Sequence, residues 1–218
     1  MHAVANVEAV ANVFVLGDAQ DVQDCLESTM VDGMFAVRPF ASAEDALNFC
    51  EPEMPGCFLL EQRIRGAGGL RVHEQLRAKG CRQPFLFVLR DGEVAAAVEA
   101  MHRGALDCIE PPFESVRMRG CIEEALARDA ESRRGQADRA VVVARVESLT
   151  PREKQILGYV AAGEITKSIA RLLEISPKTV EVHRSNIMRK MNVESAAGLL
   201  HVVAKFGLFP FVPETCRH

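Results

Sequence analysis

Residues 149–163 read LTPREKQILGYVAAG, a stretch that marks both ends of one helix. Thr150 is a typical N-cap residue, Pro151 suits the first helical position, and Glu153 can bond back to the cap. The apolar residues that follow recur at the spacing of a helix with one buried face. Gly163 is of the residue type that most often ends a helix. The stretch therefore predicts a short amphipathic helix with defined ends.

Three more helices are expected downstream. The first spans about residues 166–173 and is short. Its inward-facing residues are expected to be Ile169, Ala170, Leu172 and Leu173. Ser176 and Pro177 start the next helix, which runs to about Met191, and the last spans about 194–206. Two short helices joined by a tight turn, the second with its own cap, predict a helix-turn-helix.

The third of these four helices has a face suited to nucleic acid. At about 100° per residue, Val180, Ile187 and Met191 fall together and are predicted to face the core. The opposite face presents Lys178, Val182, Ser185 and Arg189, with Glu181 and Asn186 on its flanks. Cationic, small polar and methyl-bearing side chains suit phosphates and base edges in a major groove. An ordinary amphipathic helix with a solvated face would also fit, but the caps, the helix order and the local positive charge favour DNA.

Charge is distributed unevenly along the chain. Residues 148–218 hold 10 Lys and Arg against 6 Asp and Glu, whereas residues 1–147 hold 16 against 24. This asymmetry indicates two modules and makes the basic one the candidate for a polyanionic partner. No apolar run approaches the ~20 residues of a membrane helix, and the N-terminus lacks the basic start of a secretory signal. Seven cysteines without ligand spacing favour reduced thiols in a cytoplasmic protein, with no metal site.

Apolar runs and helical patterns alternate in the acidic front half. The expected strands are 13–16, 35–37, 57–60, 85–89 and 106–109. Helical patterns between such strands predict βα units and a five-stranded, doubly wound parallel sheet with helices on both faces. The fold class is therefore an α/β domain over residues 1–128, followed by an all-α four-helix domain over 148–218. The last helix of the front domain is expected to end near Arg128, and residues 129–147 are interpreted as a frayed helix end and a linker.

Residues 148–207 as a whole resemble the DNA-binding domain of the LuxR/FixJ class of transcription regulators. The resemblance implies that the third helix enters the major groove of promoter DNA and that the protein binds as a dimer. By position, it implies base contacts for Glu181, Val182 and Ser185. It implies backbone or base contacts for Lys178, Thr179, Arg184 and Lys190. The Arg184 stem is expected to pack at the core edge with its guanidinium reaching outward. Whether Glu181 accepts a cytosine amino group or restrains a neighbouring arginine stays open.

The front half, over residues 12–128, is similar to the receiver domain of FixJ-type response regulators, a flavodoxin- and CheY-like fold. The stretches that carry the similarity are PGCFLLE (55–61), QPFLFV (83–88), AVEAMHRGALD (97–107) and PPF (111–113). The resemblance implies a phosphoryl-accepting aspartate at the end of the third strand and two acidic residues after the first strand that hold Mg²⁺. It also implies a Thr or Ser after the fourth strand and a Lys after the fifth. This chain has Glu61, the pair Gly17 and Asp18, Leu89 and Pro111 at these positions.

Each departure weakens phosphoryl chemistry. Glutamate displaces its carboxylate by about 1 Å, which can cost ~10²-fold in a positioned reaction. Leu89 cannot hydrogen-bond a phosphoryl oxygen, and Pro111 has neither an ammonium nor an N–H. With one acidic residue missing beside Asp18, the Mg²⁺ clamp is weaker. Phosphorylation at Glu61 is therefore not expected, and Asp18 can serve as a helix cap instead.

Two interpretations of Glu61 stay open. Its carboxylate could imitate the charged, phosphorylated state by pairing with Arg63, Arg65 or Arg90, which lie along the same edge of the sheet. Alternatively, Glu61 is a solvated charge at the end of a strand. In either case the front domain would act by dimerising, by masking the DNA-binding domain, or through an input from another protein or a small molecule.

The sequence as a whole predicts a DNA-binding transcription regulator with a degenerate receiver. In relatives, the face made by residues 93–126 often dimerises, and here it offers Val94, Val98, Met101, Ile109, Met118 and Ile122, several of which must belong to the core. The main alternative is a conventional regulator switched by phosphorylation. An enzyme on a flavodoxin-like fold has no support, since no nucleophile–base pair, Gly-rich phosphate loop or metal cluster is evident, and no cofactor is expected.

Overall fold

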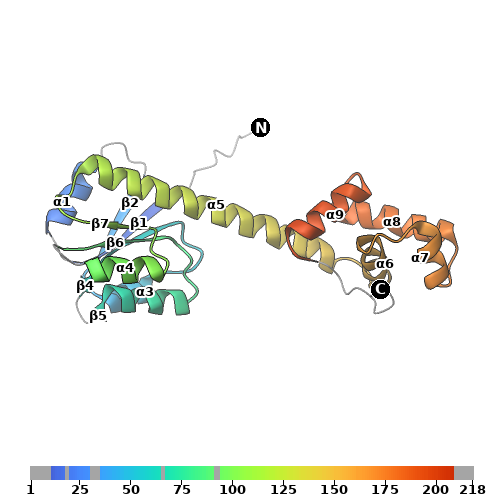
Figure 1. Ribbon diagram of the computed structural model, residues 1–218, viewed down its shortest axis with the longest axis horizontal. Helices are drawn as coiled ribbons and strands as arrows, with labels where there is room; N and C mark the ends of the chain where they lie inside the picture. Colours follow the sequence, from blue (N-terminus) through green and yellow to red (C-terminus); the bar gives the residue numbers. More distant parts are fainter. Residues whose placement is uncertain (1–10, 18–19, 30–34, 65–66, 91–93, 209–218) are drawn as a thin grey trace, which may run out of the picture. The chain divides into compact units, whose positions relative to one another are not determined.

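The structure is a computed structural model of the 218-residue chain, and it describes residues 11–17, 20–29, 35–64, 67–90 and 94–208. The chain divides into two compact units, one up to Arg133 and one from Arg134 (Figure 1). This boundary falls inside the segment that was assigned to a linker. Each unit has its own hydrophobic core and is described separately.

The first unit is built on a parallel five-stranded sheet with the order β2-β1-β3-β6-β7. Its strands are β1 (Ala11–Leu16), β2 (Phe35–Phe40), β3 (Gly56–Glu61), β6 (Phe85–Val88) and β7 (Asp107–Ile109). All five predicted strands are confirmed, and so is the α/β fold class. A short antiparallel pair, β4 (Arg63–Ile64) and β5 (Ala67–Gly68), was not predicted, because two-residue strands leave no periodic pattern.

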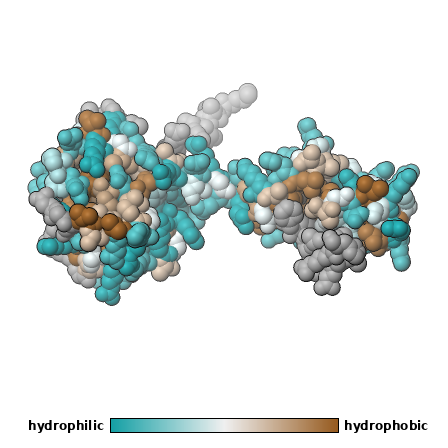
Figure 2. All heavy atoms as spheres, viewed as in Figure 1, coloured by the Kyte–Doolittle hydropathy of each residue, from teal (hydrophilic) through white to brown (hydrophobic). Residues whose placement is uncertain are grey.

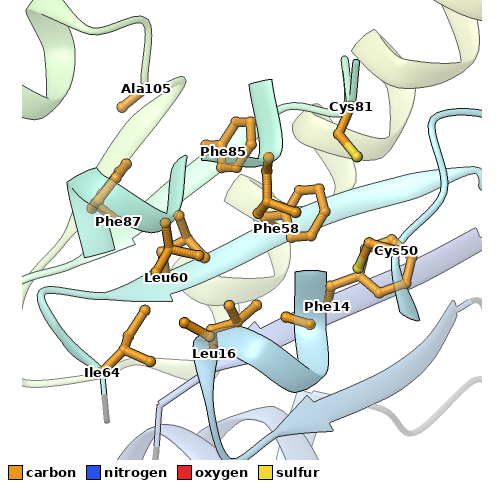
Figure 3. Close-up of a cluster of buried hydrophobic side chains, with 14 of the residues drawn as sticks. Phe14, Leu16, Cys50, Phe58, Leu60, Ile64, Cys81, Phe85, Phe87 and Ala105 are labelled. Atoms are coloured by element: carbon orange, nitrogen blue, oxygen red, sulfur yellow. The ribbon is translucent and has the colours of Figure 1, made fainter. Parts of the chain in front are cut away.

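Alternating residues of the strands point to opposite faces, and helices cover both faces of the sheet. One layer packs Phe14, Phe58 and Phe85 against α2 (Ala43–Phe49), α3 (Gly69–Ala78) and α4 (Val94–His102); Figure 3 shows its central side chains. The other layer packs the intervening strand residues, such as Leu59, against α1 (Gln20–Thr29) and α5 (Ser115–Glu147). Continuous apolar strands are expected where both faces are buried.

The last helix of the first unit is longer than predicted. We expected it to end near Arg128, but α5 continues without interruption to Glu147, so the expected frayed end was wrong. The assignment of residues 129–147 to a linker stays a prediction. Two side chains fasten its continuation to the first residue of β3 and to the loop before it. Asp129 accepts a hydrogen bond from the backbone N–H of Gly56 (2.9 Å) and one from Arg133 Nε (2.6 Å). Arg133 also donates to the carbonyl of Glu53 (2.7 Å).

The second unit contains the four predicted helices: α6 (Pro151–Ala161), α7 (Thr166–Leu172), α8 (Pro177–Met191) and α9 (Ala196–Lys205). Their core includes Ile156, Ile169, Val180, Ile187 and Met191, together with Val142 from α5. The residues predicted to face inward from α8 are therefore buried. Leu172 differs from its prediction, since it is 39% exposed, while Leu173 at the C-cap is buried.

The surface of each unit is mostly polar in the view of Figure 2, with scattered apolar residues. Val94, Val98 and Met101 on α4 are exposed, as the proposed dimer face requires. Three other residues predicted for that face, Ile109, Met118 and Ile122, are fully buried in the core and cannot contribute to it. None of the helices in the described residues is both long and apolar enough to cross a membrane.

Candidate DNA interface and receiver site

The helix ends of the second unit are fixed by the side chains that the sequence indicated. Thr150 Oγ1 accepts the Glu153 N–H (3.2 Å), and Glu153 Oε2 accepts the Thr150 N–H (2.8 Å), which completes a capping box at the start of α6. Ser176 caps α8 by accepting the Thr179 N–H at 3.0 Å, and Pro177 follows it. Gly163 follows α6 with a φ of +84°, in the left-handed region that favours glycine.

The predicted outer face of α8 is exposed. Its exposed residues are Lys178, Thr179, Glu181, Val182, Ser185 and Arg189. Val182 is 55% exposed, so its methyl groups are accessible on this face. Arg189 bonds the side-chain oxygen of Asn186 on the same helix (Nη2 to Oδ1, 3.3 Å). The surface thus offers cations, hydroxyls and one apolar group along a single helix.

Arg184 occupies the border between this outer face and the core. Its side chain is half-buried and lines a small crevice with Val160, Met188 and Leu199. This half-buried position at the core edge agrees with the expected packing of the stem, which stays a prediction.

Lys190 has a different environment from the other cations of α8. Its ammonium lies 2.7 Å from Glu153 Oε2, and it also donates to the carbonyl of Ser148 at 3.2 Å. The Glu153 side chain is only 5% exposed and that of Lys190 is 29% exposed. Burial acts to raise the pKa of Glu153, but hydrogen bonds from Lys190 and Thr150 outweigh it, so the net pKa lies below its usual value. The sequence did not indicate this pair, because its partners lie far apart in the chain.

The candidate receiver site lies at the carboxyl edge of the sheet. The register places Leu16 beside Leu60, Glu61 beside Val88, and Val88 beside Ile109. Gly17, Glu61 and Leu89 therefore meet at one edge, where the strands of a parallel sheet end. Asp18 lies outside the described residues. In the described part of the chain, no group of three or more His, Cys, Asp or Glu side chains is arranged to hold a metal ion.

Glu61 is buried at this edge, with 8% of its surface exposed. Its side chain lies directly over Gly17: a Cβ atom on residue 17 would be 2.1 Å from Glu61 Cδ and 2.3 Å from Oε1. Gly17 also has a φ of +153°, which side chains with a Cβ rarely adopt. The interpretation of Glu61 as a solvated strand-end charge was therefore wrong. The side chain of Glu61 fills the space that a side chain at residue 17 would need.

The other positions of the site are apolar or engaged elsewhere. Leu89 is 1% exposed, and its backbone N–H donates to the carbonyl of Ile109 (3.0 Å). Pro111 is half-buried and joined to Pro112 by a cis peptide bond.

Of the three arginines considered as partners for Glu61, two are described by the structure. Arg63 is exposed, and Arg65 lies outside the described residues. Arg90 binds Asp21 through two hydrogen bonds, of 2.7 and 3.1 Å. The hydrogen bond from Arg90 is the main cause that lowers the pKa of Asp21. This pair ties the end of the fourth sheet strand to α1.

Two protein families match the chain. Residues 13–123 match the response regulator receiver domain, and residues 147–203 match the luxR family of bacterial regulatory proteins. The transcriptional regulatory protein FixJ of Bradyrhizobium diazoefficiens is 33% identical over 90% of this chain and 96% of its own length. The response regulator protein TodT of Pseudomonas putida is 34% identical over 88% of this chain and 85% of its own.

Solved structures of response regulators are also similar to this chain. The response regulator StyR aligns with a TM-score of 0.80 and 36% identity, over 90% of this chain and 100% of that one. Full-length FixJ from B. japonicum aligns with a TM-score of 0.54 and 33% identity, over 91% and 98%. A receiver unit and a helix-turn-helix unit in one chain define a DNA-binding transcriptional response regulator. The chain belongs to the FixJ-type response regulators, with a LuxR-type DNA-binding domain.

Proposed function

We propose that this regulator binds promoter DNA as a dimer through α8, and that its receiver acts without phosphorylation at Glu61. The DNA part of the proposal is supported by the exposed cations and hydroxyls on α8, which suit phosphate oxygens. Val182 and Ser185 share one side of the helix and suit a thymine methyl group and a base edge. Thr179 is exposed next to this face, whereas Arg184 lies at the border with the core, so that a backbone contact would depend on its long side chain reaching outward.

The observation that carries the receiver part is the packing of Glu61 against Gly17. A phosphoryl acceptor must present its oxygen to a donor in line, with a metal ion beside it. Glu61 is 8% exposed and lies over the backbone of Gly17, the residue that stands where receivers have one of their metal-binding carboxylates. Glu61, the residue that would have to accept the phosphoryl group, thus occupies the space that an acidic side chain at position 17 would need.

The remaining substitutions support the same conclusion. Leu89 brings a buried hydrocarbon side chain to the position of a hydroxyl donor, and Pro111 brings no donor to the position of a lysine. A carboxylate that is buried at this edge and not phosphorylated leaves the receiver without the usual covalent switch. We therefore propose that the receiver unit takes its input from another protein, a small molecule or dimerisation, in a cytoplasmic regulator.

A mass measurement tests the receiver part. The full chain is incubated with a small phosphodonor and Mg²⁺, and its intact mass is then recorded. We expect no gain of phosphate for the natural chain or for Glu61→Gln. A gain of one phosphate in the natural chain that disappears in Glu61→Gln would instead establish a conventional phosphorylation switch. Binding of beryllofluoride with Mg²⁺ at the sheet edge would also contradict the proposal.

A further inference from the structure

Among the residues of α8 that were predicted to contact DNA, Lys190 has the environment that fits such contact least. Its ammonium is shared between the Glu153 carboxylate, at 2.7 Å, and the Ser148 carbonyl, at 3.2 Å. The same Glu153 oxygen also accepts the Thr150 N–H of the capping box, at 2.8 Å. The carboxylate is almost completely removed from solvent. Taking Lys190 away from this carboxylate would leave a buried charge with fewer partners, which is costly.

The position of Lys190 around the helix agrees with this environment. At about 100° per residue, Lys190 lies about 110° from the centre of the face formed by Lys178, Val182, Ser185 and Arg189. It is about 60° from Ile187, which is fully buried. Lys178, by contrast, is exposed on the outer face near the N-terminal end of α8.

We infer that Lys190 is a positioning residue, which sets the orientation of the recognition helix by binding Glu153, and that it does not contact DNA. The ion pair joins the last turn of α8 to the first turn of α6, and the Ser148 carbonyl adds a second link just before that turn. A hydrogen-bonded pair with little solvent access has a narrower range of geometries than an exposed one. The orientation of Val182 and Ser185 toward bases then depends on a bond at the far end of their helix.

This inference rests on the proposed docking of α8 on DNA, and the experiment separates the two. Five variants of the full chain are compared: Lys190→Met, Lys190→Arg, Glu153→Gln, the double variant Lys190→Met/Glu153→Gln, and Lys178→Met. Lys190→Met keeps the apolar stem and removes the ammonium. Glu153→Gln keeps an oxygen for the Thr150 N–H and removes the charge. Lys178→Met is the matched control, because it removes an exposed lysine from the same helix. Affinity for a DNA duplex is measured over a series of salt concentrations.

A phosphate-contacting lysine contributes roughly 0.9 to the slope of log affinity against log salt. We expect Lys178→Met to lower the slope by that amount. Lys190→Met should leave the slope unchanged and weaken binding by about tenfold at every salt concentration. Glu153→Gln should weaken binding in the same way, and the double variant should bind no worse than either single one, since both remove one interaction. Lys190→Arg, which keeps the ion pair, should bind DNA with the affinity of the natural chain.

Several results would overturn the inference. If Lys190→Met lowers the slope as Lys178→Met does, Lys190 contacts phosphate. Additive losses in the double variant, or no loss of affinity in Lys190→Met, would equally contradict a positioning role. If Lys178→Met leaves the slope unchanged, the docking of α8 itself is wrong. Thermal unfolding identifies any variant that is unfolded at the binding temperature. If Lys190→Met is unfolded, Lys190→Arg provides the test. A folded Lys190→Arg variant that binds DNA more weakly than the natural chain would contradict the role of the ion pair.

Discussion

Replacing Gly17 with alanine should destabilise the receiver unit, and it should do so through Glu61. The new Cβ would lie 2.1 Å from Glu61 Cδ, although non-bonded carbons normally approach no closer than about 3.5 Å. Glu61 would therefore have to leave its buried position or displace its neighbours. Overpacking of this kind costs about 1–3 kcal/mol of unfolding free energy.

Backbone strain adds a second contribution. Gly17 has a φ of +153°, and a residue with a Cβ held in such a region costs about 1–3 kcal/mol. Replacing Glu61 with alanine removes the side chain that the new Cβ meets but leaves the strain unchanged. In that background Gly17→Ala should therefore cost only the strain. The difference between the two costs, about 1–3 kcal/mol, measures the contact between residues 17 and 61.

Native-state hydrogen exchange is a suitable assay, because amides of β1 and β3 report the stability of the receiver unit separately from the helix-turn-helix unit. Four chains are compared: the natural chain, Gly17→Ala, Glu61→Ala and the double variant. We expect the double variant to lose less unfolding free energy than the two single variants lose together. An equal cost of Gly17→Ala in both backgrounds would refute the packing of Glu61 over Gly17.

Three other predictions concern separate parts of the molecule. Burial, with Arg77 and Arg103 nearby, lowers the pKa of His73 to about 4 from 6.5, so stability present above pH 6.5 should be lost as the pH falls toward 4. The loss amounts to about 3 kcal/mol, measurable by urea unfolding, and it should disappear in His73→Leu. Arg133→Ala should destabilise the attachment of α5 by about 1–3 kcal/mol and lower hydrogen-exchange protection after Asp129, whereas the exposed neighbour Arg134→Ala should not. Val182→Ala should reduce the free-energy difference between the preferred and other base pairs at one position of the site by about 1–3 kcal/mol. A binding-site selection measures this change, and the salt dependence of binding should stay the same.

Most of the fold could be predicted from the sequence because its signals are local. The strands are continuous apolar runs, and the helices of the second unit begin at Thr150, Ser176 and their prolines. The end of α5 could not be predicted in this way. Its residues after Arg128 are polar and contain Gly135, and the helix is fastened by contacts of Asp129 and Arg133 to a loop that lies distant in sequence.

In the candidate sites, too, features with a local sequence signal could be predicted, and features that depend on contacts distant in sequence could not. The exposed face of α8 follows from helical periodicity, because exposure depends on which residues the helix buries. The pairing of Lys190 with Glu153 and the packing of Glu61 over Gly17 depend on three-dimensional neighbours. A glycine at residue 17 indicated only a missing carboxylate in the sequence, whereas the structure shows that its lack of a Cβ makes room for Glu61. The assignment of individual DNA contacts stays a prediction.

The most direct test of a DNA-binding regulator that needs no phosphate is its affinity for DNA before and after treatment with a small phosphodonor and Mg²⁺. Fluorescence anisotropy with a labelled duplex at low salt gives the affinity of the full chain, with Glu61→Gln measured in parallel. We predict that the untreated protein binds and that treatment changes neither its affinity nor its salt dependence. Binding that appears only after treatment, and that is lost in Glu61→Gln, would contradict the account.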